Sequence, residues 1–230
     1  MADNELIVQV PQNEQLPAEY QEAWDTVVKT GDFIPRIQLY GSNSNAVKRE
    51  QISQGRYGFP KTADEIVDLG KEVQCIPLAW SFKAMEFQGD DPPVTSYNPK
   101  DTVFQKIKMT ADEGGLTGSV YGIEFLLFLP SPPSGVDNFV TLFLNSPSSR
   151  REATSFRGLL GRGAMLKVRL ASNKKGTWHV PAITTCSTPF TNLPDEVTMT
   201  AKIEQFKNPP VTQQEAASDD EVAAQQEVAR

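Results

Sequence analysis

The segment that decides the expected fold is VQCIPLAWSFKAMEF, residues 73–87. Apolar side chains recur at every second position from Ile76 to Ala84, and this period is typical of a β-strand with one buried face. The run is longer than an average strand of about five or six residues, so we expect one long strand that bends. The side chains expected on its core-facing side are Ile76, Leu78, Trp80, Phe82 and Ala84.

Shorter strands follow this segment, separated by residues that favour turns. Pro130–Gly135 and Asn173–Gly176 are rich in proline, glycine and asparagine, which end strands. Between them, Arg150–Leu160 follows Ser148 or Ser149 as a cap and precedes Gly161, a pattern typical of a helix. The strands expected after the first are residues 120–129, 139–145, 164–171 and 177–186.

The order of these elements is strand, strand, strand, helix, strand, strand. A long first strand and a helix between the third and fourth strands are typical of the OB-fold, a five-stranded barrel that often binds oligonucleotides. We therefore expect an α+β protein, mainly β with a few helices, built on a five-stranded OB-like barrel. A β-sandwich with one helical excursion is the alternative.

This pattern divides the chain into four expected parts. Residues 1–70 are expected to form an N-terminal extension packed on the barrel, and residues 71–190 the barrel domain itself. Residues 191–210 are expected to form a C-terminal helix that opens at Pro194, a residue suited to a first helical turn. Residues 211–230 are rich in glutamine, alanine and acids, which predicts a disordered acidic tail.

Local patterns predict further elements within these parts. Residues 16–30 have apolar positions at helical spacing, and residues 33–40 alternate weakly like a strand. Thr62 and Glu65 have the spacing of a capping box, which predicts a short helix after them. Residues 88–118 hold proline and glycine pairs, so we expect an irregular insertion there.

The totals describe an ordinary globular chain of 230 residues, 39% hydrophobic and 22% charged. No apolar run approaches the roughly 20 residues that span a bilayer, and the acidic start lacks the features of a signal peptide. Cys75 and Cys186 are too few for a disulfide framework, so we expect reduced thiols in a cytoplasmic protein. The net charge of −7 differs from that of a simple basic nucleic-acid binder.

One segment reverses this acidic balance. Between residues 150 and 175 the only acid is Glu152, and a basic segment of this kind favours a polyanionic partner. The alternative is a solvated face, although an inert surface normally mixes charges of both signs. The predicted phosphate contacts are Arg150, Arg151, Arg157, Arg162, Lys167, Arg169, Lys174 and Lys175.

A single-stranded ligand also needs aromatic side chains on which its bases stack. Tyr57 and Phe59 are candidates because Arg49 and Arg56 lie near them in the sequence. Trp178, at the start of the last expected strand, is a further candidate. These five residues complete the predicted nucleic-acid-binding set.

Catalytic and metal-binding patterns are weak by comparison. His179 is the only histidine, and one histidine with two distant cysteines does not make a metal site. Gly158–Gly163 contains glycines but lacks the lysine and Ser/Thr of a phosphate-binding loop, so we interpret it as the end of a helix. We therefore expect no catalytic residue, no metal and no cofactor.

The architecture resembles that of phage-type single-stranded DNA-binding proteins, which combine an OB barrel, a C-terminal helix and an acidic tail. The resemblance covers roughly residues 73–230 and rests on no specific motif. It implies a protein that coats exposed strands during replication, often as a dimer, and recruits replication proteins through its tail. The tail here is short and ends in Val228-Ala-Arg230, where that family commonly has an aromatic residue.

The sequence thus predicts a non-enzymatic, sequence-tolerant single-stranded DNA-binding protein that supports DNA replication or recombination, with DNA favoured over RNA. A cytoplasmic location, in the host if the protein is viral, and a possible homodimer belong to the same prediction, without a membrane partner. The alternative is a structural or assembly protein of a virion or scaffold that binds no nucleic acid. An enzyme that uses carboxylates is a third reading.

Overall fold

The structure is a computed structural model that describes residues 34–62, 65–88, 91–114, 118–174, 176–187, 190 and 192–209. Two elements expected from the sequence, the helix at 16–30 and the tail at 211–230, lie outside the described residues. All of the described residues belong to the compact unit that begins at Ile34.

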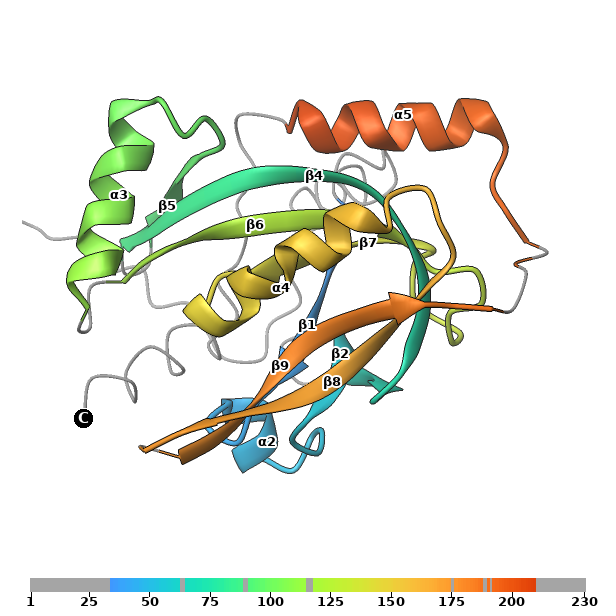
Figure 1. Cartoon of the computed structure of the whole chain (residues 1–230), viewed down its shortest axis with the longest axis horizontal. Coiled ribbons are helices and arrows are strands. Elements are labelled where there is room, and N and C mark those ends of the chain that lie inside the picture. The colour runs from blue at the N-terminus through green and yellow to red at the C-terminus, as the bar shows by residue number, and fades with distance from the viewer. Residues whose placement is uncertain are drawn as a thin grey trace, which may run out of the picture. The chain divides into compact units, whose positions relative to one another are not determined.

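A single mixed sheet of nine strands dominates this unit (Figure 1). Its order is β3-β2-β1-β7-β6-β4-β8-β9, and β5 pairs with β4 outside this path. All pairs are antiparallel except β1 with β7, which is parallel. The strands are β1 (Arg36–Tyr40), β2 (Arg56–Pro60), β3 (Ile66–Gly70), β4 (Val73–Gln88), β5 (Asp91–Ser96), β6 (Ser119–Phe128), β7 (Phe139–Leu144), β8 (Ala164–Asn173) and β9 (Gly176–Thr185).

The prediction of a closed five-stranded OB-like barrel is wrong. The five expected strands exist as β4, β6, β7, β8 and β9, but β1 occupies the edge of β7 and extends the sheet through β2 and β3. No ladder joins β3 to β9 among the described strands, so the sheet stays open at both ends. Alternating hydrophobicity identifies strands but not their partners, which is why the sequence did not reveal this extension.

The sheet nevertheless curls around one large core. Side chains of β1 and β2, including Ile37 and Tyr57, share a buried cluster with Leu166 of β8 and Ile183 of β9. The Tyr57 hydroxyl donates a hydrogen bond to the Lys167 carbonyl oxygen at 2.9 Å. Side-chain packing, rather than a closed ladder, therefore brings β2 and β8 together.

Two local predictions also need correction. No helix follows Thr62 and Glu65. Thr62 Oγ1 accepts a hydrogen bond from the Glu65 amide at 3.0 Å. The Lys61 amide donates to the Glu65 carbonyl oxygen at 2.9 Å. These bonds form the turn of the β2–β3 hairpin, because the same Ser/Thr geometry serves turns as well as helix starts. The segment 88–118 was expected to be irregular, but its described residues include strand β5 and helix α3 (Thr102–Glu113).

Three more helices are described: α2 (Asn45–Lys48), α4 (Pro147–Gly158) and α5 (Glu196–Lys207). Helix α4 begins earlier than predicted because Ser146, not Ser148 or Ser149, is its N-cap, in a reciprocal capping box with Ser149. Asp195 caps α5 by accepting the Thr198 amide at 2.9 Å. None of the described helices is long and apolar enough to cross a membrane.

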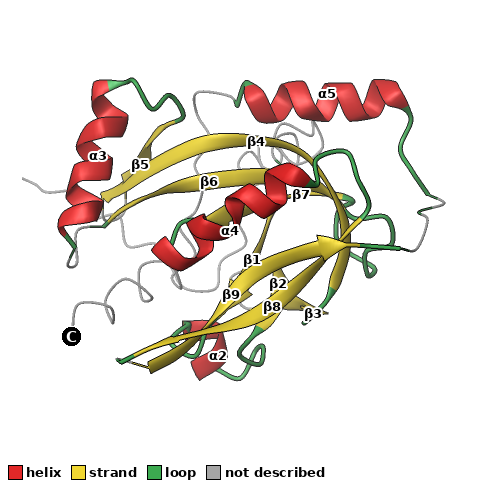
Figure 2. Ribbon diagram, viewed as in Figure 1, coloured by secondary structure: helices red, strands yellow, loops and turns green. Residues whose placement is uncertain are grey.

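The helices cover the sheet on opposite faces (Figure 2). Phe104 of α3 packs against Ala84, and Phe156 of α4 packs in the cluster that contains Phe125 and Trp80, so α3 and α4 share one face. Phe206 of α5 packs against Ala79 and Leu126 on the other face. Helix α4, which carries Arg150, Arg151 and Arg157, therefore lies on the same face of the sheet as α3.

Candidate nucleic-acid interface

Helix α4 places two arginines over aromatic rings of the sheet. Arg150 and Arg157 are seven residues apart, close to two helical turns, and therefore stand on the same side of the helix. The Arg157 guanidinium carbon lies 4.8 Å from the centre of the Trp80 ring, and that of Arg150 lies 4.0 Å from the centre of the Tyr121 ring. Both distances are within the range of a cation–π interaction.

A row of edge-to-face contacts continues from Trp80 towards α3. The Trp80 and Phe82 ring centres are 5.3 Å apart, and those of Phe82 and Phe104 are 6.4 Å apart. Phe104 is buried, but Phe82 remains 37% exposed. Contacts of this geometry orient the rings, so an exposed ring is held in place between two helices.

We call Trp80, Phe82 and Tyr121 the aromatic strip. The three residues lie on one face of two neighbouring strands, because Ala84 of β4 pairs with Tyr121 of β6. Arg150 and Arg157 stand on the α4 side of this strip, and Phe104 and Lys108 stand on the α3 side. The arrangement combines aromatic rings with cations, which is what single strands require.

Four charged or polar side chains meet at the Tyr121 end of the strip. The Tyr121 hydroxyl donates to Asp112 Oδ1 at 2.7 Å, and Lys108 Nζ donates to Asp112 Oδ2 at 3.1 Å. The bond from Tyr121 lowers the pKa of the Asp112 carboxyl, while desolvation by burial raises the pKa of the Tyr121 hydroxyl. The hydrogen bond to Asp112 raises the pKa of Lys108, so Asp112 and Lys108 are charged at neutral pH while the Tyr121 hydroxyl keeps its proton.

The opposite side of α4 faces β8 and β9. Arg169 Nη2 lies 2.5 Å from Glu152 Oε1, and the Trp178 indole N–H donates to Ser148 Oγ at 3.2 Å. Lys167 Nζ lies 3.4 Å from Glu72 Oε1. Two of the predicted phosphate contacts, Lys167 and Arg169, are thus partly neutralised by the protein's own carboxylates.

The remaining cations of the basic segment differ in their accessibility. Arg151, Arg157, Arg162 and Lys174 are exposed, whereas Arg150 is half-buried. Lys175 lies outside the described residues. Arg151, Arg157 and Arg162 therefore remain as accessible cations on or directly after α4.

The predicted stacking residues of β2 are not accessible. Tyr57 is completely buried and Phe59 is nearly so, and burial raises the pKa of the Tyr57 hydroxyl. Arg56 Nε donates to Asp68 Oδ2 at 2.6 Å, and Arg49 is exposed after α2. In this conformation neither ring offers a face to a base.

Sequence reasoning placed Trp80 and Phe82 in the core, together with Leu78. A register shift between Pro77 and Ala79 reverses the alternation of β4 at this point. Leu78 packs with the cluster under α5, whereas Trp80 packs with the cluster under α4. Pro77 was the available signal, because proline within a sheet often marks a bulge.

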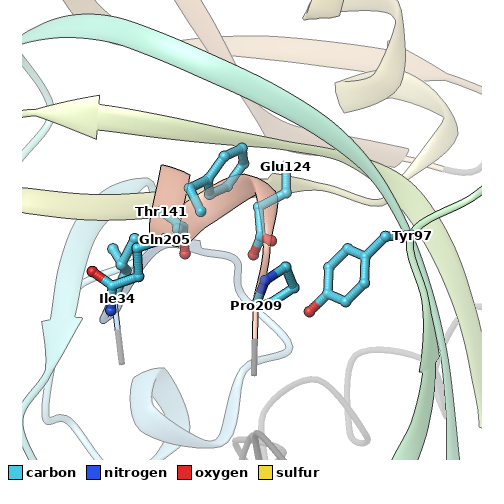
Figure 3. Close-up of a pocket in the computed structure, with 7 residues that line it drawn as sticks. Ile34, Tyr97, Glu124, Thr141, Gln205 and Pro209 are labelled. Atoms are coloured by element: carbon cyan, nitrogen blue, oxygen red, sulfur yellow. The ribbon is translucent and has the colours of Figure 1, made fainter. Parts of the chain in front are cut away.

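The face under α5 carries a buried ion pair instead. Lys83 Nζ lies 3.2 Å from Glu124 Oε1, and their side chains are only 1% and 6% exposed. Figure 3 shows the Glu124 and Tyr97 side chains pointing towards a small cavity that Thr141 and Gln205 also line. Its volume of about 20 Å³ fits about one water molecule, so the cavity is too small for an organic ligand.

No group of three metal-ligating side chains occurs in the part of the chain that the structure describes. His179 is half-buried and lies against Gly55, where an added Cβ would approach the imidazole Nε2 to 2.6 Å. Comparison of the chain with protein families, with curated proteins and with solved structures finds no match.

Proposed function

We propose that the protein binds single-stranded nucleic acid without catalysis, with bases stacking on Phe82 and Trp80 of the aromatic strip and phosphates contacting Arg151, Arg157 and Arg162. The observation that carries this proposal is the guanidinium of Arg157 over Trp80, next to the exposed ring of Phe82. Aromatic rings and arginine planes are the surfaces on which unpaired bases stack.

This arrangement favours binding that depends little on the base sequence of the nucleic acid. Every base has a π-face, so stacking on Phe82 or Trp80 contributes about 1–3 kcal/mol per base with little discrimination. Arg151, Arg157 and Arg162 would contact the phosphates of the nucleic acid, and such contacts do not distinguish one base sequence from another. Lys167 and Arg169 would contribute less because Glu72 and Glu152 already lie beside them.

A protein of this kind would cover exposed DNA during replication or recombination in the cytoplasm, as phage-type single-stranded DNA-binding proteins do. The acidic residues of 211–230 would then serve as a contact for replication proteins, and a homodimer would extend the covered strand. These assignments rest only on the predicted C-terminal helix and acidic tail, because the described strands do not form the barrel of such proteins.

The proposal is tested by titrating the protein with a fluorescent oligo(dT) and with a duplex of equal length at two salt concentrations. We expect tighter binding of the single strand, and affinity that falls with salt because bound phosphates release counterions. Weak binding of both ligands at low salt, together with large salt-insensitive oligomers in light scattering, would favour an assembly protein instead.

A further inference from the structure

The cluster at Tyr121 joins three elements that border the aromatic strip. Asp112 belongs to α3, Tyr121 to β6 and Arg150 to α4. The Tyr121 hydroxyl is bonded to Asp112 at 2.7 Å, and the Arg150 guanidinium carbon lies 4.0 Å from the centre of the same ring. One side chain of the sheet is therefore in contact with both neighbouring helices.

Arg150 is also tied to the backbone of the sheet. Its Nη1 donates to the Tyr121 carbonyl oxygen at 3.0 Å and to the Asn145 carbonyl oxygen at 2.7 Å. The second bond reaches the end of β7, where Gly122 lets the backbone pass close by: a Cβ on Gly122 would clash with the Leu144 carbonyl oxygen. The first turn of α4 is thus fixed to β6 and β7 through one guanidinium.

We propose that Asp112, Tyr121 and Arg150 form a brace whose role is to position α4, and with it Arg157, over the aromatic strip. This inference rests on the proposed function, because it assigns a role within the same binding surface. In this account Arg150 and Tyr121 are positioning residues, not contacts to phosphate or base. The sequence alone grouped Arg150 with the phosphate contacts.

Two features of the geometry indicate that Arg150 positions α4 and does not contact phosphate. The two backbone carbonyl groups orient its Nη1, and the guanidinium carbon lies over the Tyr121 ring, 4.0 Å from its centre. Tyr121 in turn has two cations near its ring, since Lys108 Nζ lies 5.4 Å from the ring centre. A ring in these surroundings contributes orientation rather than an open stacking surface.

The brace predicts a particular pattern of binding defects. Tyr121→Phe removes the bond to Asp112 but keeps the ring under Arg150, and Asp112→Asn removes the carboxylate. Either change should weaken oligo(dT) binding about threefold to tenfold, the range expected for the loss of one hydrogen bond of ordinary net strength. For Tyr121→Phe, which changes no charge, the salt dependence should stay the same because no phosphate contact is lost.

Arg150→Lys distinguishes positioning from contact. A lysine keeps the charge and would preserve a phosphate contact, but it cannot reproduce the guanidinium contact with the Tyr121 ring together with the two carbonyl bonds. The brace therefore predicts weaker binding by Arg150→Lys as well, again with an unchanged salt slope. Asp137→Asn, which changes an exposed acid in the β6–β7 loop, is the matched control for Asp112→Asn and should bind like the wild type.

Hydrogen exchange provides a readout that does not depend on the ligand. In the free protein, Tyr121→Phe and Arg150→Lys should speed exchange of the first hydrogen-bonded amides of α4, residues 149–152, and leave α5 unchanged. Wild-type affinity of folded Tyr121→Phe and Arg150→Lys, or unchanged exchange of those amides, would overturn the brace while leaving the proposed function intact. Failure of the wild type itself to bind oligo(dT) would instead overturn the proposed function.

Discussion

Phe82 and Lys83 are neighbours in β4 with opposite environments: Phe82 is 37% exposed, and Lys83 is 1% exposed. Phe82 stands beside Trp80 on the face covered by α3 and α4. Lys83 points to the other face, where it pairs with Glu124. The same strand thus supplies an accessible aromatic surface and a buried ion pair, and the two can be altered independently.

Replacement of the exposed ring tests base stacking. Phe82→Ala should weaken oligo(dT) binding by about 1–3 kcal/mol, the amount expected for one stacked base. Fluorescence anisotropy with a labelled oligonucleotide measures the change. Met109→Ala removes an apolar side chain of α3 that is 63% exposed, and serves as the control for lost surface area. Equal affinity of the Phe82 and Met109 variants would exclude Phe82 from the contact.

Removal of the arginines tests the phosphate contacts. Arg157→Gln and Arg162→Gln should each reduce the magnitude of the log–log salt slope by about 0.7, because each neutralised phosphate of a single strand contributes that amount. Lys207→Gln removes an exposed cation from α5, on the opposite face of the sheet, and should leave the slope unchanged. An identical slope in all three variants would contradict the assignment.

Much of the fold could be predicted from local pattern. The expected strands at 120–129, 139–145, 164–171 and 177–186 correspond to β6, β7, β8 and β9. Alternating hydrophobicity predicts such strands because it depends only on neighbouring residues. The pairing of β1 with β7 could not be predicted in this way, since it joins Arg36 to Thr141 across most of the described chain.

Only part of the candidate site could be predicted from the sequence, because the rest depends on contacts between residues that are distant in the chain. The basic segment was visible in the sequence, but the position of Glu72 beside Lys167 depends on the fold. Tyr57 and Phe59 lie near basic residues in sequence, yet β2 turns both rings into the core. Phe82 is exposed although Ala84, on the same face of β4, is buried, and this difference depends on where the helices cover the strand.

Because Lys83 and Glu124 form a buried ion pair, replacing one of them should lower the free energy of unfolding more than replacing both. Lys83→Met should destabilise the protein by about 3–5 kcal/mol, because it leaves Glu124 charged and buried. Lys83→Met combined with Glu124→Leu should recover most of this loss, since an apolar pair needs no desolvation of charge. Urea denaturation measures the free energy of unfolding of the single and the double variant.

Lys61→Met provides the control for this experiment. Lys61 pairs with Glu65 at 3.0 Å on the surface, and its removal should change the free energy of unfolding by less than about 1 kcal/mol. A loss after Lys83→Met no larger than that of Lys61→Met would show that Lys83 is hydrated in solution.

The two thiols should differ in reactivity. Burial raises the pKa of Cys75 to about 12, so this thiol remains protonated at pH 8 and is also shielded from reagents. Cys186 is half-buried at the end of β9, and we expect it to react first with a disulfide reagent. Mass spectrometry of the labelled protein identifies the modified residue, and denaturant should expose Cys75. Rapid labelling of Cys75 in the folded protein would contradict its burial.

Photochemical cross-linking of bound oligo(dT), followed by peptide mass spectrometry, tests the aromatic strip most directly. Aromatic side chains stacked on thymine are the expected points of attachment, so the account predicts cross-links in β4 at Phe82 or Trp80. Phe82→Ala should shift or remove them, and Met109→Ala should not. Cross-links confined to Trp178 or to residues 36–60, with none in β4, would contradict the account.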